Sequence, residues 1–346
     1  MNKLINSLKD FKKTTIWKSI IEYLFYPFFN LIWSYLINFK AKILYFLWNL
    51  KKKNYFDFSD NDKLIISDNN YFKEIANKIL KETDYLKEDA KQKLFDLNYS
   101  EKLRKKNDAS GELPYTASLY DGLSPELKKE IVTFASSDKM ITTACKYMKI
   151  FPILTRVQVS LNIPREGSKP RSAILWHKDG FGFKNLDFFM NVSEVDENNG
   201  PFYCLEKKIK AGIFKSFDYL MTRTGERNKV TLENFDKQFK DTGLIQLKGK
   251  SGTGIFLDSF SVFHRGGFCK LKDRIMLRFC YQSHDAFCEN FLTNSDEFMY
   301  DKSITKNNTK DIFKSFIFFK KPSTFMKLLS KKLLKFYYLI EFKYKL

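Results

Sequence analysis

The pattern of polar and apolar residues divides the chain into a helical first part and a strand-rich second part. Residues 71–97 repeat apolar positions at helical spacing, and Ser124 followed by Pro125 is typical of a helix start. From residue 154 the pattern changes, because residues 155–162 (TRVQVSLN) alternate polar and apolar positions like a strand with one polar face. Further strands are expected at 173–177, 187–192, 202–205, 254–258 and 274–282. Short strands separated by Gly, Pro and Asn turns favour a barrel or a sandwich.

These elements suggest a core with additions on both sides. Residues 54–150 are expected to form a helical region that packs on a core at 151–290. Within that core, residues 206–250 interrupt the strands and are interpreted as an insertion near the mouth of a barrel. The expected fold class is therefore mainly β with flanking helices, an α+β arrangement. The two ends, 1–53 and 291–346, are expected to be a basic apolar segment and a basic amphipathic tail.

The net charge of +20 is concentrated at the two ends of the chain. Residues 1–53 contain ten lysines and two acidic residues, and residues 302–346 contain twelve lysines and two acidic residues. The part between them is nearly neutral, which argues against a globally basic nucleic-acid-binding domain. We therefore expect no nucleic-acid partner, and we expect the ends to contact an anionic surface.

Residues 23–39 contain no charged residue and are flanked by lysines on both sides. The stretch is slightly shorter than the roughly 20 apolar residues of a membrane span, and Pro27 and Asn30 weaken it further. It predicts an interfacial membrane anchor within residues 1–53, with a helix that packs on the core as the equal alternative. Residues 325–336 predict a basic amphipathic helix with the same two alternatives. The expected location is cytoplasmic, peripheral on the inner face of the membrane.

The five cysteines do not suggest a disulfide framework. Their number is odd and no pair has CxxC spacing, which also argues against a zinc site. Buried free thiols in a reducing compartment are the preferred interpretation.

Candidate chemistry centres on the histidines, of which the chain has three: His177, His264 and His284. His177 and Asp179 form an H-x-D motif at a strand end, where residues i and i+2 point to the same face. His264 follows beyond a later strand. Two histidines and one carboxylate are the ligand set of non-haem Fe(II) oxygenases, since they leave open positions on the metal. H-x-D alone is typical of a surface turn, so the hypothesis depends on the combination. His284 has no partner pattern and is taken as a bystander.

Such an iron site can bind a 2-oxo acid, whose distal carboxylate needs an anchor. Arginine suits this role because its planar fork binds carboxylate in a bidentate manner. Arg274 lies ten residues after His264 and would share a strand face with Arg278. We expect Arg274 to bind the oxo acid, with Arg278 as the alternative. Gln158, on the polar face of strand 155–162, is a further candidate for binding the oxo acid or the substrate, and a solvent-exposed face is its alternative.

Residues from about 123 to 283 resemble the phytanoyl-CoA dioxygenase family. The matching stretches are 175–180 (LWHKDG), 192–202 (VSEVDENNGPF), 258–266 (DSFSVFHRG) and 273–277 (DRIML). The resemblance implies a double-stranded β-helix, or jelly-roll, core with iron ligands His177, Asp179 and His264 and with 2-oxoglutarate bound by Arg274. The chain departs from the family at 203–208 (YCLEKK), where members often have a Pro-Gly-Ser-His turn. This departure leaves the substrate open.

The expected function is an Fe(II)- and 2-oxoglutarate-dependent dioxygenase. It would consume O2, release succinate and CO2, and hydroxylate a small-molecule or lipid-like substrate. Asp179 favours hydroxylation over halogenation, because a halide would need the position of the carboxylate, and desaturation and ring closure stay open as alternatives. The alternatives are a non-catalytic membrane-surface or ligand-binding jelly-roll protein, a nucleic-acid oxygenase, which the nearly neutral core disfavours, and a sugar-binding cupin-like module.

Overall fold

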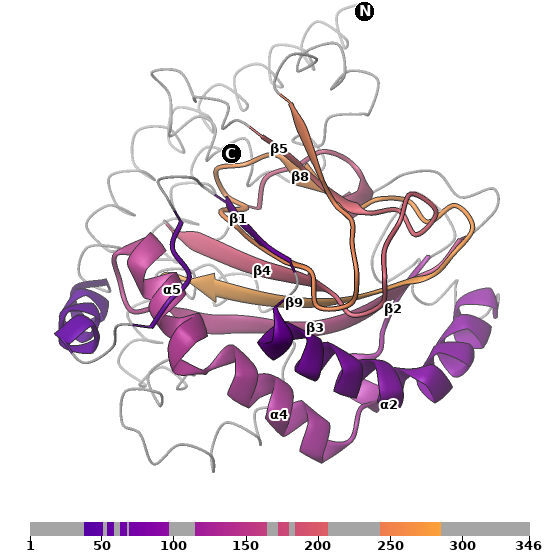
Figure 1. Cartoon of the computed structure of the whole chain (residues 1–346), viewed down its shortest axis with the longest axis horizontal. Coiled ribbons are helices and arrows are strands. Elements are labelled where there is room, and N and C mark those ends of the chain that lie inside the picture. Colours follow the sequence, from indigo (N-terminus) through magenta and orange to yellow (C-terminus); the bar gives the residue numbers. More distant parts are fainter. Residues whose placement is uncertain are drawn as a thin grey trace, which may run out of the picture.

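The computed structural model describes residues 38–50, 54–58, 63–67, 69–96, 115–164, 172–179, 184–206 and 243–284. These residues form two antiparallel sheets with helices on one side (Figure 1). The larger sheet contains, in spatial order, β1 (Lys63–Ile66), β7 (Gly254–Leu257), β4 (Asn185–Asn191), β9 (Arg274–Gln282), β3 (Ile153–Asn162) and β2 (Thr116–Ser118). The smaller sheet contains β6 (Leu244–Leu247), β5 (Phe202–Leu205) and β8 (His264–Arg265).

The chain crosses repeatedly between the two sheets. After β3 in the larger sheet, His177 pairs with His264 of β8, and the chain then returns to β4. It continues through β5 and β6 in the smaller sheet, β7 in the larger, β8 in the smaller and β9 in the larger. This alternation is the connectivity of a jelly roll, so the predicted fold class is confirmed.

Three long helices cover the outer face of the larger sheet: α2 (Asn70–Phe95), α4 (Pro125–Ala135) and α5 (Asp138–Met148). The start of α4 follows the sequence prediction, because the Ser124 hydroxyl accepts a hydrogen bond from the Leu127 N–H at 3.2 Å and Pro125 takes the first helical position. Helix α2 agrees with the predicted helix at 71–97 to within two residues. No helix among the described residues has the length and apolar composition needed to cross a membrane.

The larger sheet separates two apolar clusters. Between the helices and the sheet, Phe72, Phe134, Phe188 and Phe279 pack in edge-on, tilted and stacked pairs with ring centroids 5.0–6.5 Å apart. The second cluster lies between the two sheets and includes Met276. Strand β9 therefore contributes alternate residues to two different interiors.

Several boundaries differ from the sequence prediction. Residues 244–247 fall in the expected insertion but form β6, which pairs with β5 along its whole length. Strands β1 and β2 lie in the region expected to be helical, where pairing with β7 and β3 overrides local preference. Residues 207–242, the tail from 285 onward with the predicted helix at 325–336, and residues 1–37 with most of the predicted anchor lie outside the described residues.

The last part of the predicted N-terminal segment, residues 38–50, forms a helix that packs on the core. Trp48 is buried, donates a hydrogen bond from its indole nitrogen to the Thr142 hydroxyl at 2.9 Å, and meets Phe151 edge-on. The Ala41 carbonyl accepts a hydrogen bond from the Phe151 N–H at 3.0 Å. For this portion of the segment, the alternative of a helix packed on the protein agrees with the structure.

Candidate metal centre

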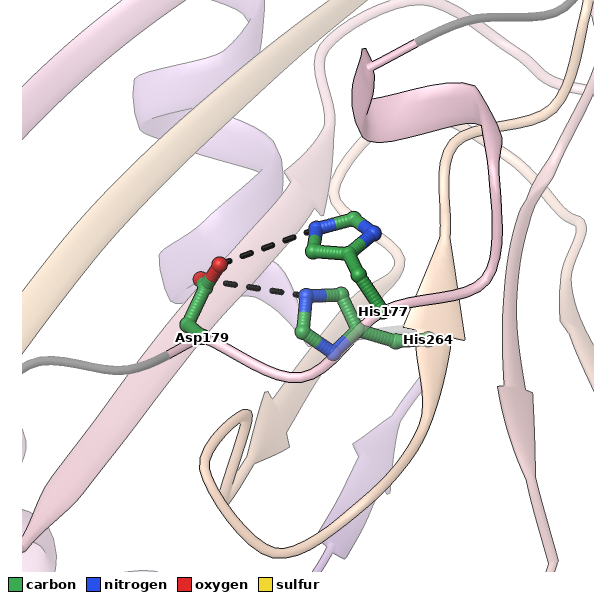
Figure 2. A group of neighbouring side chains, drawn as sticks. All are labelled: His177, Asp179 and His264. Carbon is green, nitrogen blue, oxygen red and sulfur yellow. Dashed lines mark ion pairs between the residues drawn. The ribbon is translucent and has the colours of Figure 1, made fainter. Parts of the chain in front are cut away.

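His177, Asp179 and His264 converge between the two sheets (Figure 2). Two backbone hydrogen bonds join His177 to His264, with N···O distances of 3.0 and 2.9 Å, so the histidines lie directly opposite each other. Asp179 follows His177 by two residues, and its N–H donates to the Ser259 carbonyl at 2.9 Å. The ligand atoms of the three side chains all lie within 4.8 Å of one another. The structure thus brings together the three residues that the sequence singled out as iron ligands.

Both imidazoles present Nε2 to the Asp179 carboxylate. The distance to the nearest carboxylate oxygen is 3.6 Å from His177 Nε2 and 3.8 Å from His264 Nε2. The other ring nitrogen, Nδ1, lies 2.8 Å from the Leu175 carbonyl in His177 and 3.1 Å from the Val262 carbonyl in His264. A carbonyl can only accept, so Nδ1 carries the proton in each ring and Nε2 keeps a free lone pair. Metal-binding histidines are held in this way in proteins.

The electrostatics of the group suit a cation. Burial alone would raise the pKa of Asp179, but the charge of Arg278 holds that pKa well below its usual value. Burial lowers the pKa of His264 to about 3, and the neighbouring His177 contributes to this shift. At neutral pH the site therefore offers a carboxylate and an uncharged His264, both in the protonation state that metal binding requires.

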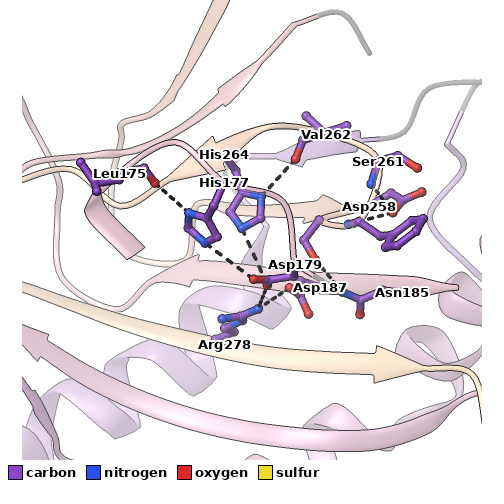
Figure 3. Close-up of polar contacts among 12 residues, drawn as sticks. Leu175, His177, Asp179, Asn185, Asp187, Asp258, Ser261, Val262, His264 and Arg278 are labelled. Atoms are coloured by element: carbon purple, nitrogen blue, oxygen red, sulfur yellow. Dashed lines mark hydrogen bonds and ion pairs between the residues drawn. The ribbon is translucent and has the colours of Figure 1, made fainter. Parts of the chain in front are cut away.

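Arg278 joins Asp179 to a second carboxylate, Asp187 (Figure 3). Its Nη2 donates to Asp179 Oδ2 and, at 2.5 Å, to Oδ2 of the fully buried Asp187 on β4. The guanidinium lies 4.9 Å from the centre of the Phe189 ring. Burial disfavours the charged form, yet the two carboxylates hold the pKa of Arg278 well above its usual value. Arg278 therefore pairs with both carboxylates and orients Asp179, while its buried Nε has no hydrogen-bond partner among the described residues.

The turn between β7 and β8 supports the centre from one side. Asp258 accepts hydrogen bonds from the Phe260 and Ser261 N–H groups at 3.1 and 3.0 Å. The Asn185 side-chain amide donates to the Ser259 hydroxyl at 2.5 Å, while the Ser259 carbonyl holds the Asp179 N–H. The backbone of Asp179 is thereby fixed to both β4 and the segment that leads into His264.

Arg274 is buried on the same strand and face as Arg278 but differs from it in its hydrogen-bond partners. It is 2% exposed, and its Nε and Nη1 atoms have no hydrogen-bond partner among the described residues. Burial lowers the pKa of Arg274 from its usual value, although an arginine stays protonated in proteins. A buried cation is costly without a counter-charge, and the described residues provide none for Arg274, so this guanidinium suits an anionic ligand.

The two remaining histidine and glutamine candidates lie in different parts of the molecule. Gln158 lies opposite Arg278 in the β3–β9 ladder and is half-buried, so it shares the inner face of the sheet. His284 lies elsewhere, with its Nε2 3.1 Å from the Phe151 carbonyl. Asp187 was not predicted as a site residue, although a charged residue within the apolar strand 185–191 (NLDFFMN) is a signal that could have found it.

The described cysteines are buried free thiols: Cys145, Cys204, Cys269 and Cys280. Burial raises the pKa of Cys204 to about 12 and that of Cys269 to about 11. The prediction of buried free thiols is thus confirmed for these four residues.

Comparisons with known proteins gave weak structural similarity alone. No family model matches the chain, and no curated protein matches it. The crystal structure of EctD from S. alaskensis with 2-oxoglutarate and 5-hydroxyectoine is 15% identical, with a TM-score of 0.40, and the match covers 65% of this chain and 73% of that chain. HygX from Streptomyces hygroscopicus, with nickel and 2-oxoglutarate bound, is 14% identical with a TM-score of 0.37, covering 65% and 84%. The non-heme alpha ketoglutarate dependent epimerase SnoN from nogalamycin biosynthesis is 12% identical with a TM-score of 0.36, covering 65% and 79%. At TM-scores of this size, a functional assignment depends on the residues of this chain.

Proposed function

We propose that this protein is an Fe(II)- and 2-oxoglutarate-dependent dioxygenase. One observation carries the proposal: a His–Asp–His group, with His264 buried and the other two residues half-buried, shares the interior between the sheets with a buried arginine that has no counter-charge among the described residues. Two histidines and one carboxylate suit a non-haem Fe(II) ion with open coordination positions. The arginine suits the distal carboxylate of a 2-oxo acid.

The roles of the two arginines on β9 follow from their partners. Arg278 already donates to two carboxylates, and releasing it would leave Asp187 buried and uncompensated. Arg274 has two unused buried donors and no carboxylate partner among the described residues, whereas Arg278 has one unused donor and two carboxylate partners. We therefore assign 2-oxoglutarate binding to Arg274 and the positioning of the metal ligand Asp179 to Arg278. Gln158 is kept as a candidate contact for the oxo acid or the substrate.

The bound metal would supply O2 activation coupled to the oxidative decarboxylation of 2-oxoglutarate to succinate and CO2, with hydroxylation of the substrate. The chain supplies orientation and a dry interior. His177 and His264 are fixed by the Leu175 and Val262 carbonyls, and Trp176 and Phe202 pack in the apolar cluster around them. Exclusion of water by such a shell protects reactive steps from side reactions.

The finer assignment is a small-molecule or lipid-like substrate and an enzyme of the phytanoyl-CoA dioxygenase type. It is supported by the motifs around His177, Gly200 and His264. A reducing, cytoplasmic location is supported by the four buried free thiols.

Substrate-independent turnover tests the proposal. Purified protein is incubated with Fe(II), ascorbate, 2-oxoglutarate and O2, and succinate is quantified, since these enzymes decarboxylate 2-oxoglutarate slowly without substrate. We expect succinate from the wild type and from His284→Ala, a matched histidine outside the centre, and none from His264→Ala. Folded wild-type protein that binds metal but forms no succinate would favour a non-catalytic ligand-binding jelly roll.

A further inference from the structure

The helix at 38–50 has two apolar faces, and one of them is open to solvent. Ala41, Leu44 and Trp48 are buried against the protein. The opposite side exposes five large apolar residues: Phe39 (56% exposed), Ile43 (48%), Phe46 (63%), Leu47 (39%) and Leu50 (67%). Figure 1 shows this helix, in indigo, at the margin of the molecule. We call these five residues the apolar stripe.

The stripe is narrow and bordered by lysines. At about 100° per residue, its five positions fall within an arc of roughly 100°, centred on the side away from Trp48. Lys40 falls just beyond one border of this arc and Lys42 just beyond the other, and both side chains are exposed. Three further lysines follow in the sequence at 51–53.

Single exposed apolar residues are ordinary on protein surfaces, but a contiguous stripe marks an interaction site. Apolar residues between flanking lysines are typical of helices that lie in a membrane interface, where lysine stems follow the apolar surface and their charges reach the phosphates. We propose that helix 38–50 docks the protein on an anionic lipid surface through the apolar stripe, with Lys40 and Lys42 at the headgroups.

Charge favours lipid over a second copy of the chain as the occupant. Two helices packed stripe to stripe would bring their lysine borders together, and like charges in one interface oppose association. Anionic headgroups attract exposed lysines such as these. The apolar stripe is separate from the metal centre, so this proposal can be tested independently of the proposed function.

Vesicle binding of the full chain tests the proposal. Co-sedimentation is measured with phosphatidylcholine vesicles with and without phosphatidylglycerol, for the wild type, Phe46→Ser/Leu50→Ser and the control Leu271→Ser, whose side chain is 77% exposed elsewhere. We expect binding that requires phosphatidylglycerol, a reduction of the partition coefficient by about tenfold or more in the double variant, and no change in the control. Equal binding of the double variant and the wild type overturns the proposal.

A second measurement locates the helix directly. Phe46→Trp and, as control, Leu271→Trp are mixed with anionic vesicles whose acyl chains are brominated, and fluorescence is compared with the wild type. Quenching of the added Trp in Phe46→Trp alone supports insertion of the stripe. No added quenching, or a wild-type dimer that Phe46→Ser/Leu50→Ser converts to a monomer in sedimentation equilibrium without vesicle binding, overturns the lipid proposal.

Discussion

The two faces of strand β9 carry residues of opposite character. Ile275, Leu277, Phe279 and Tyr281 pack against the helices in the outer apolar cluster. On the inner face, Arg274 and Arg278 alternate with Met276 and point between the sheets. The outer face stabilises the fold by burial of apolar surface, while the inner face holds charges that burial alone would disfavour. Two carboxylates compensate Arg278, and we assign Arg274 to the proposed anionic co-substrate, so the outer face of β9 serves stability and the inner face the proposed function.

Loss of a metal ligand should have the largest effect on metal binding and little effect on the stability of the fold. We expect His177→Ala to lower the affinity for Fe(II) by more than about a hundredfold and to abolish succinate formation. Its thermal midpoint should stay close to that of the metal-free wild type, because His177 is half-buried beside the sheet core. Metal titration and thermal unfolding check both statements, and a variant with wild-type affinity would remove His177 from the centre.

Truncation of a side chain on the outer face of β9 should lower the stability of the fold and leave metal binding unchanged. Phe279 is fully buried among Phe134 and Phe188, so Phe279→Ala should lower the free energy of unfolding by about 3–5 kcal/mol. The affinity of the remaining folded protein for Fe(II) should be unchanged. Urea unfolding of the metal-free protein measures the first value, and a loss below about 1 kcal/mol would contradict the assignment of this face to the core.

The two arginines on the inner face should respond oppositely to the same substitution. Arg278→Met leaves the buried Asp187 and Asp179 without their partner, so we expect a loss of about 3–5 kcal/mol of stability. Arg274→Met removes a buried charge that has no ion-pair partner among the described residues, so the metal-free protein should keep its stability or gain up to about 2 kcal/mol. Chemical denaturation without 2-oxoglutarate distinguishes the variants, and equal destabilisation of both would contradict the difference in pairing.

A smaller loss of Fe(II) affinity is expected when Asp187 is replaced, because its carboxylate offsets the charge of Arg278. Asp187→Asn leaves Arg278 to pair with Asp179 alone, where it competes more strongly with a metal. We expect the affinity for Fe(II) to fall about 10–100-fold, measured anaerobically by competition with a chelator. Asp196→Asn, which removes an exposed carboxylate paired with Lys272, is the matched control. An unchanged affinity in Asp187→Asn would show that Asp187 has no influence on the metal ligand.

The sequence predicted the fold class and the three candidate ligands because each has a local signature. Alternation marks the long strands, and H-x-D offers two ligand types two residues apart. The strand expected at 173–177 was wrong, because residues 172–174 form a 3-10 helix and His177 makes only an isolated bridge to His264. The division of roles between Arg274 and Arg278 could not be predicted, since a two-residue period gives both the same face and their partners come from other segments. Asp187 was missed for the same reason, because its partner Arg278 lies 91 residues away. The short strands β1, β6 and β8 depend on long-range pairing rather than on local pattern.

An anaerobic titration with Fe(II) and 2-oxoglutarate, followed by visible absorption, tests the central claim most directly. The claim is that His177, Asp179 and His264 hold iron and that Arg274 holds the co-substrate. We expect a metal-to-ligand charge-transfer band in the wild type that is absent in His177→Ala and appears at higher 2-oxoglutarate concentration in Arg274→Ala. A folded wild-type protein without the band, or an Arg274→Ala titration identical to that of the wild type, would contradict it.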